Sequence, residues 1–176
     1  MHMDFNDFLI KSPKLDQISK PGIKSQIKMA PESREIYPKT NKNLRFAATT
    51  MLLYPINKVL YFCLIRRTFK TAIHSNQIGF PGGEKDASDK NYWDTALREM
   101  NEEIGVKPRQ VKYITNLSKL FIPVSRFIVF PYMAITNKRP MFKINYDEVD
   151  YIIEVKLSML LLKNSGEKSK IIDRKV

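Results

Sequence analysis

The chain has little cysteine and little histidine, which argues against a disulfide-rich scaffold and against a zinc site built from these residues. It contains one cysteine, Cys63, and two histidines among 176 residues. One cysteine cannot form a disulfide within the chain, so a disulfide-rich secreted scaffold is excluded and a reducing compartment, the cytoplasm, is expected. Cys63 lies in an apolar run and is expected to be a small buried side chain. Nothing in the sequence forms the Cys/His cluster that zinc favours.

Long hydrophobic runs are also lacking. No apolar run approaches the roughly 18 residues that a helix needs to span a bilayer. The first residues, MHMDFNDFLI, are acidic where a secretory signal is basic, and no long apolar core follows them. We therefore expect neither a membrane partner nor a secretory signal.

Acidic residues are scarce relative to basic ones. The chain has 18 Asp and Glu against 30 Lys and Arg, which gives a net charge of +12. Such an excess suits a polyanionic partner, namely nucleic acid, an anionic membrane surface or a phosphorylated small molecule, and it equally suits a solvated surface. The lysines are spread along the chain without a nucleic-acid-binding signature, so nucleic acid is not the expected partner.

The composition indicates one globular domain preceded by an arm. Of the residues, 43% are hydrophobic and 27% are charged, which is ordinary for a folded domain of this length. Residues 1–43 are polar and basic with four prolines, and we expect an N-terminal arm with a short helix over 4–10 and otherwise extended structure. Residues 44–176 are expected to form the domain.

The domain pattern consists of strands around one central helix. β-forming residues predict strands at 44–54, 59–66, 77–80, 111–122, 126–135 and 151–155. The helix is expected to start between Ser88 and Asp94 and to end before Gly105, with Pro108 just beyond. A further helix or turn is expected over 157–162. This order is typical of an α+β fold.

The central helix carries three acidic residues close together. Glu99, Glu102 and Glu103 fall within an arc of roughly 100° on one face, opposite the apolar residues, so we expect them on the outer side of the helix. Three such carboxylates repel one another and favour a compensating cation, for which oxygen ligands suggest Mg²⁺ or Mn²⁺. Gly82 and Gly83 upstream leave backbone groups open to a metal or a phosphate. The alternative is a solvent-exposed acidic helix face.

Residues 83–106 resemble the Nudix box, G-x5-E-x7-R-E-U-x-E-E-x-G-U, in which U is a bulky apolar residue. Gly83 takes the first glycine, and residues 98–106 match the second half at every fixed position. Asp89 stands in place of the first glutamate, and eight residues rather than seven separate it from Arg98. The resemblance, which covers roughly residues 44–160, implies the α+β Nudix fold, with a mixed β-sheet sandwiched by helices.

Segments beside the box resemble the coenzyme A pyrophosphatase branch of that family. Residues 64–83 are similar to L-L-T-K-R-S-x3-R-x-H-x-G-Q-I-S-F-P-G-G, and residues 120–131 are similar to LYIPxSxFLVxP. The first segment departs from its pattern at Ala72, Asn76 and Gly79. The resemblance implies hydrolysis of coenzyme A or its thioesters to 3′,5′-ADP and 4′-phosphopantetheine.

Two other functions stay open at this point. One is a broader Nudix hydrolase that acts on nucleoside diphosphate derivatives such as ADP-ribose and NADH, or on nucleoside triphosphates. The other is a non-catalytic nucleotide- or RNA-binding protein on a Nudix scaffold.

The resemblance also implies a role for individual residues. The cation, Mg²⁺ or Mn²⁺, would be held by the Gly83 carbonyl, Glu99, Glu102 and Glu103. Arg98 would orient the glutamates of the box, so the expected catalytic residues are Arg98, Glu102 and a general base, Glu148. Asp147 and Asp150 are alternatives to Glu148 as the base. The expected substrate contacts are Arg66, Arg67 and His74.

The resemblance implies, finally, something about the end of the chain and its partners. Family members generally continue past the position of Val176 with a strand and a helix that cover the sheet. We therefore expect a truncated C-terminal part and an apolar sheet face that is either exposed or covered by a second subunit. The expected partners are a small-molecule nucleotide substrate and a second copy of the chain in a homodimer.

Overall fold

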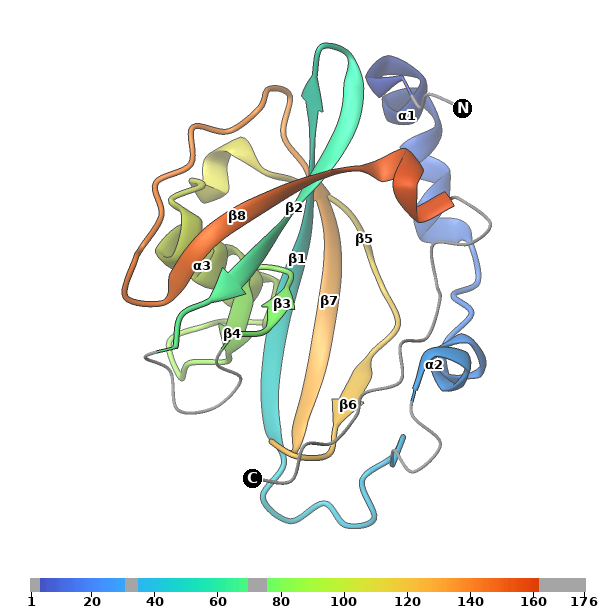
Figure 1. Ribbon diagram of the computed structural model, residues 1–176. Coiled ribbons are helices and arrows are strands. Elements are labelled where there is room, and N and C mark those ends of the chain that lie inside the picture. The colour runs from blue at the N-terminus through green and yellow to red at the C-terminus, as the bar shows by residue number, and fades with distance from the viewer. Residues whose placement is uncertain (1–3, 31–34, 70–75, 162–176) are drawn as a thin grey trace.

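A mixed β-sheet forms the centre of the structure, a computed structural model that describes residues 4–30, 35–69 and 76–161 (Figure 1). The sheet has eight strands, five of them in the order β3-β2-β1-β7-β5. β4 pairs with β1, β6 with β7 and β8 with β2. β1 and β7 are parallel, and the other pairs are antiparallel. The expected α+β architecture is confirmed.

The bounds of the elements follow the sequence closely in the domain. The strands are β1 (Arg45–Ile56), β2 (Val59–Arg67), β3 (Ile78–Gly79), β4 (Gly82–Glu84), β5 (Lys112–Asn116), β6 (Leu120–Ile122), β7 (Phe127–Ile135) and β8 (Val149–Lys156). The helices are α1 (Phe5–Lys11), α2 (Ile23–Met29) and α3 (Tyr92–Ile104), with short 3₁₀ helices η1 (Ser12–Gln17), η2 (Pro108–Gln110) and η3 (Leu157–Leu161). None of the helices in these described ranges is long and apolar enough to cross a membrane.

Helix α3 begins and ends where the sequence predicts. The side chain of Asn91 caps its first turn by accepting a hydrogen bond from the Asp94 amide at 3.0 Å. Gly105 ends it in the left-handed conformation, with φ 73°, which glycine adopts without a side-chain clash.

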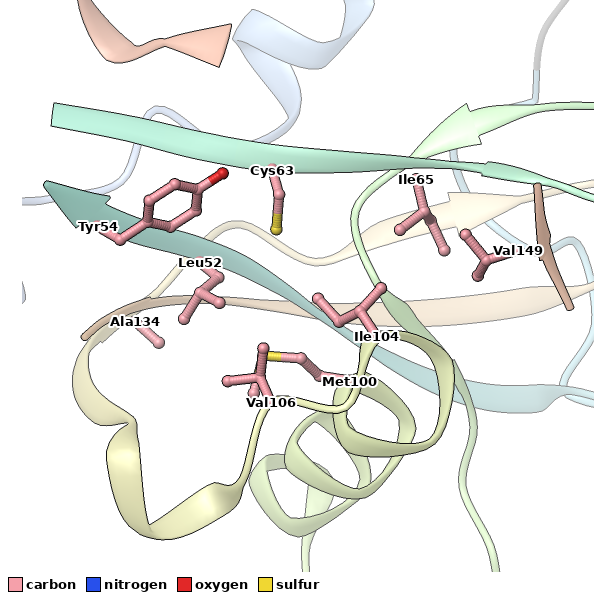
Figure 2. Close-up of a cluster of buried hydrophobic side chains, with 9 residues drawn as sticks. All are labelled: Leu52, Tyr54, Cys63, Ile65, Met100, Ile104, Val106, Ala134 and Val149. Carbon is pink, nitrogen blue, oxygen red and sulfur yellow. The ribbon is translucent and has the colours of Figure 1, made fainter. Parts of the chain in front are cut away.

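One face of the sheet packs against α3. Met100 and Ile104 of α3 point toward Leu52 of β1 and Ile65 of β2 in a buried cluster (Figure 2). Cys63 belongs to this cluster and is fully buried, as expected, and burial raises the pKa of its thiol to about 12. The cluster holds the helix against the middle of the sheet.

The prediction that all three acidic side chains of α3 lie on its outer side is wrong. Glu103 is fully buried and Glu99 is largely buried, whereas Glu102 is exposed. The stripe of Thr95, Glu99 and Glu103 lies against β1 and β4, beside the apolar stripe rather than opposite it. Helical periodicity gives the angles between side chains, but it does not say which arc meets the sheet.

The N-terminal arm lies on the side of the sheet opposite α3 and packs against part of that face (Figure 1). Phe8 of α1 packs with Leu53, Leu60 and Leu157 in a second buried cluster. The expectation that this face is exposed or covered by a second subunit is therefore wrong for the part that these residues form. The homodimer stays a prediction.

The arm contains more structure than the sequence analysis expected. The short helix at its start is confirmed as α1, which Asp4 caps by accepting a hydrogen bond from the Asn6 amide at 2.8 Å. The rest is not simply extended, because η1 and α2 follow. α2 is tied to the domain where Gln26 donates a hydrogen bond to the Lys119 carbonyl at 2.8 Å. A contact between residues this far apart in the chain cannot be predicted from the pattern of neighbouring residues.

The segment predicted as one strand over 111–122 is two strands. β5 and β6 both pair with β7, but at different positions along it. Between them lies Pro131 of β7, which has no amide hydrogen to donate to a neighbouring strand. Its carbonyl still accepts a hydrogen bond from the Leu117 amide at 2.7 Å, so the chain passes close without forming a regular ladder.

The docking of the arm makes a stability prediction. Phe8→Ala should lower the free energy of unfolding by about 2–3 kcal/mol, because it removes a buried aromatic side chain at the edge of the core. Ile10→Ala in the same helix is the matched control, since Ile10 is 76% exposed, and it should change the free energy by less than about 0.5 kcal/mol. Urea denaturation measures both. Equal effects would contradict the packing of α1 on the sheet.

Candidate functional site

The site is built around the bend at Pro81 and the two glycines after it, Gly82 and Gly83, which begin β4 and pair with β1 beside α3. We call these three residues the glycine turn. Gly82 has φ +150°, and a β-carbon there would lie 2.2 Å from the Ala48 carbonyl oxygen of β1. A β-carbon on Gly83 would lie 2.2 Å from Oε2 of Glu99. A side chain at Gly82 would meet the backbone of β1, and one at Gly83 would displace the carboxylate of Glu99, so the glycines allow the turn, strand β1 and the acidic stripe of α3 to come together.

Glu103 lies buried beneath this turn. The Gly82 amide donates a hydrogen bond to its Oε2 at 2.7 Å, and Nη2 of Arg67 lies 3.1 Å from its Oε1. Oε1 nevertheless accepts no hydrogen bond from any residue that the structure describes. Burial raises the pKa of Glu103 to about 8, against the opposing effect of Arg67. The carboxyl group is thus short of positive charge.

Arg98 holds the two other glutamates of the helix. Its Nη1 donates hydrogen bonds to Oε1 of Glu99 at 2.8 Å and to Oε2 of Glu102 at 2.9 Å. Its Nη2 donates to the Glu84 carbonyl at 2.9 Å, which ties the helix to β4. Burial still raises the pKa of Glu99, with Arg98 acting against it. Arg98 therefore fixes the orientation of both carboxylates.

Asp89 is a further hydrogen-bond partner of Arg98, a role that was not predicted from the sequence. The residue is 7% exposed, and its carboxylate accepts two hydrogen bonds from Arg98, from Nε to Oδ1 and from Nη2 to Oδ2, both at 3.0 Å. This pairing holds the pKa of Asp89 down at about 2. Its position in the box was the only signal for this contact, and the extra residue before Arg98 obscured it.

A bulge in β8 sorts the three candidates for the general base. Pairing with β2 runs from Arg66↔Tyr151 directly to Arg67↔Val149, so Asp150 has no partner in the ladder. Val149 consequently points into the core, while Asp150 lies on the outside and accepts a hydrogen bond from Arg66 at 2.8 Å. Asp150 is therefore directed away from the acidic stripe of α3.

Glu148 is the member of that group that lies close to the glutamates of α3. It is partly buried, and its charge contributes to the raised pKa values of Glu99 and Glu103. Its backbone is fixed, because its carbonyl accepts a hydrogen bond from the Thr68 amide at 3.0 Å. Asp147, the other alternative, is exposed.

The residues expected to contact the substrate do not lie together. Arg67 donates to the Gly82 carbonyl and pairs with Glu103, so it lies inside the site. Arg66 points to the other side of β2, where Asn76 and Asp150 bind it. His74 lies outside the described residues.

The expected cation ligands are near one another but are not arranged as a ready-made metal cage. Across 4–30, 35–69 and 76–161, no three Asp, Glu, His or Cys side chains converge as ligands. Arg98 draws Glu99 and Glu102 toward itself, and Gly82 holds Glu103. The assignment of these residues as cation ligands therefore stays a prediction.

The chemistry of these residues nevertheless fits a divalent cation. The donors are all oxygens, which suits Mg²⁺ or Mn²⁺. Oε1 of Glu103 is buried without a hydrogen bond from the described residues, and the pKa values of Glu99 and Glu103 are both raised. A nearby positive charge would relieve both conditions.

Comparison with known families and sequences finds similar proteins. The model of the NUDIX domain family matches residues 44–169. Nudix hydrolase 15, mitochondrial, of Arabidopsis thaliana is 31% identical over 146 residues, which are 82% of this chain and 50% of that protein. The Nudix hydrolase NudL of Pectobacterium atrosepticum is 36% identical over 94 residues, which are 53% and 48%. The chain thus spans about half the length of these relatives.

Solved structures share the fold at lower sequence identity. An Ap4A hydrolase binary complex from C. elegans has a TM-score of 0.55 and 19% identity, over 65% of this chain and 83% of that one. The NUDIX domain of NrtR from Shewanella oneidensis, solved with ADP ribose, has a TM-score of 0.54 and 18% identity, over 78% and 85%. These similarities support the architecture alone.

The pairing of Asp89 with Arg98 predicts a pH-dependent contribution to stability. Because the pKa of Asp89 is about 2 in the folded protein and near 4 in an unfolded chain, its contribution is present above pH 4 and is lost as the pH falls toward 2. Asp89→Asn should therefore lower the free energy of unfolding at pH 7 by about 1–3 kcal/mol, and by progressively less between pH 4 and pH 2.

Urea denaturation at several pH values measures this effect. Asp86→Asn is the control, since Asp86 lies in the same loop, is exposed, and accepts a hydrogen bond from the Ser88 amide rather than an arginine. Its effect should be smaller. An Asp89→Asn effect of the same size at pH 2 and pH 7 would show that the ion pair is not its source.

Proposed function

The chain belongs to the NUDIX domain family, and from that membership we propose that it is a metal-dependent pyrophosphatase of coenzyme A or its thioesters. It would release 3′,5′-ADP and 4′-phosphopantetheine. The observation that carries the proposal is that Glu99 and Glu103 lie against Gly83 and Gly82, with Glu148 near enough to contribute to the raised pKa of both.

The cation would be held by the box residues. Its ligands would be Glu99, Glu102, Glu103 and the carbonyl oxygen of Gly83. A bound Mg²⁺ or Mn²⁺ neutralises the negative charge of a diphosphate and lowers the pKa of a water molecule. Arg98 supports this site by orienting Glu99 and Glu102 through hydrogen bonds of 2.8 and 2.9 Å.

Glu148 would act as the general base. It takes a proton from the attacking water, whose oxygen forms a bond to one phosphorus as the bond from that phosphorus to the bridging oxygen breaks. The bridging oxygen leaves with the other phosphate. The hydrogen bond from the Thr68 amide to the Glu148 carbonyl keeps this residue at the end of β2, close to Glu99 and Glu103.

The choice of coenzyme A as substrate rests on the sequence around the box. The segment over 77–83, which resembles the coenzyme A branch, forms β3 and leads into the glycine turn of the site. The net charge of +12 suits a ligand that carries a 3′-phosphate as well as a diphosphate. Other nucleoside diphosphate derivatives share the diphosphate and are the natural competitors.

A product assay tests the proposal. Purified protein with Mn²⁺ or Mg²⁺ is given coenzyme A, ADP-ribose, NADH and a nucleoside triphosphate in turn, and the products are separated by chromatography. We expect 3′,5′-ADP and 4′-phosphopantetheine from coenzyme A, with the highest kcat/KM of the panel. If coenzyme A stays intact while ADP-ribose or NADH is hydrolysed, the protein is instead a broader hydrolase of nucleoside diphosphate derivatives.

Glu102→Gln separates an enzyme from a binding protein in the same assay. Glu102 is exposed, so the fold should persist, but kcat should fall by at least about 100-fold as a charged ligand is lost. Glu35→Gln is the control, because Glu35 pairs with Lys39 in the arm, and its activity should match the unmodified chain. Nucleotide binding without turnover in the unmodified chain would identify a non-catalytic protein.

A further inference from the structure

Arg67 connects three segments of the site. It ends β2, its Nη2 donates a hydrogen bond to the Gly82 carbonyl, and the same nitrogen lies 3.1 Å from Oε1 of Glu103. The first partner belongs to the glycine turn and the second to α3. One guanidinium group therefore links the sheet, the turn and the helix.

The backbone of Arg67 is itself fixed. Its amide donates to the Gln77 carbonyl at 3.0 Å, and its carbonyl accepts from the Asn76 amide at 3.2 Å. The next residue, Thr68, donates to the Glu148 carbonyl. The side chain of Arg67 thus starts from a firmly held strand end that also supports the expected base.

The neighbouring arginine shows that this placement is specific. Arg66 points to the opposite face of β2, where it donates to Asn76 and Asp150 and lies over the ring of Tyr151. Alternation along a strand allows only one of two adjacent side chains to face α3. That side chain is Arg67.

We infer that Arg67 is a positioning residue that sets the orientation of Glu103 and of the glycine turn for cation binding, rather than a ligand of the substrate. The inference rests on the proposed function, because Glu103 is taken there as a cation ligand. The Gly82 amide fixes one carboxylate oxygen of Glu103, and Arg67 lies beside the other, which accepts no hydrogen bond from the described residues. Both contacts are made by Nη2 of Arg67, so a substrate phosphate that took this nitrogen would break them.

Metal binding measured without substrate tests this role. Arg67→Met keeps a long side chain but removes the guanidinium group. The affinity for Mn²⁺ is measured from the electron paramagnetic resonance signal of free Mn²⁺, and it should fall at least about tenfold in this variant. At saturating Mn²⁺, the KM for coenzyme A should stay within about twofold of the unmodified chain. Arg67→Lys should recover part of the Mn²⁺ affinity.

A control removes a comparable ion pair elsewhere. Arg139 donates to both carboxylate oxygens of Glu154, at 2.9 and 2.7 Å, away from the glycine turn. Arg139→Met should leave Mn²⁺ affinity unchanged. If Arg67→Met does not fold, Arg67→Lys carries the same comparison, since weakened Mn²⁺ binding with an unchanged KM still supports the inference.

The alternatives give different results. Unchanged Mn²⁺ affinity in the Arg67 variants would overturn the inference, and a raised KM beside it would make Arg67 a substrate ligand. An unmodified chain that binds no Mn²⁺ would overturn the proposed function and this inference with it. If the unmodified chain and Arg67→Met bind Mn²⁺ equally strongly, the proposed function stands and only the inference about Arg67 is overturned.

Discussion

The close approach of the glycine turn to α3 is the constraint on which the site depends. A single added carbon on Gly82 would meet β1, and one on Gly83 would meet the carboxylate of Glu99. Because the turn comes this near, its amide reaches Glu103, which is buried between helix and sheet. The buried cluster under α3 (Figure 2) holds the helix against the sheet, close to the glycine turn.

Charge is distributed unevenly within a chain that is basic overall. Among the described residues, the guanidinium groups of Arg67 and Arg98 pair with four carboxylates around the turn and α3, and Glu148 adds a fifth carboxyl group nearby. The five are Asp89, Glu99, Glu102, Glu103 and Glu148. Arg98 is shared among three of the five, and the raised pKa of Glu103 follows from its burial with too little positive charge nearby. A divalent cation is the kind of ligand that such an imbalance favours.

Much of this arrangement could be predicted from sequence, and what could not has physical reasons. Gly105 is a local signal that located the end of α3, whereas the start was predicted only to lie between Ser88 and Asp94. Which arc of that helix meets the sheet depends on distant strands, so the burial of Glu103 was missed. The pairing of Asp89 with Arg98 and the bulge at Asp150 depend on geometry that residue spacing does not encode.

Mn²⁺ binding by Gly83→Ala tests the central claim most directly. The added methyl group would displace only the flexible end of Glu99, so the fold should persist while Mn²⁺ affinity falls at least about tenfold. Gly79→Ala is the matched control, because a β-carbon there meets nothing within 4 Å, and its affinity should equal that of the unmodified chain. Equal Mn²⁺ affinity in Gly83→Ala and Gly79→Ala would contradict the claim that the closeness of this turn to α3 builds the cation site.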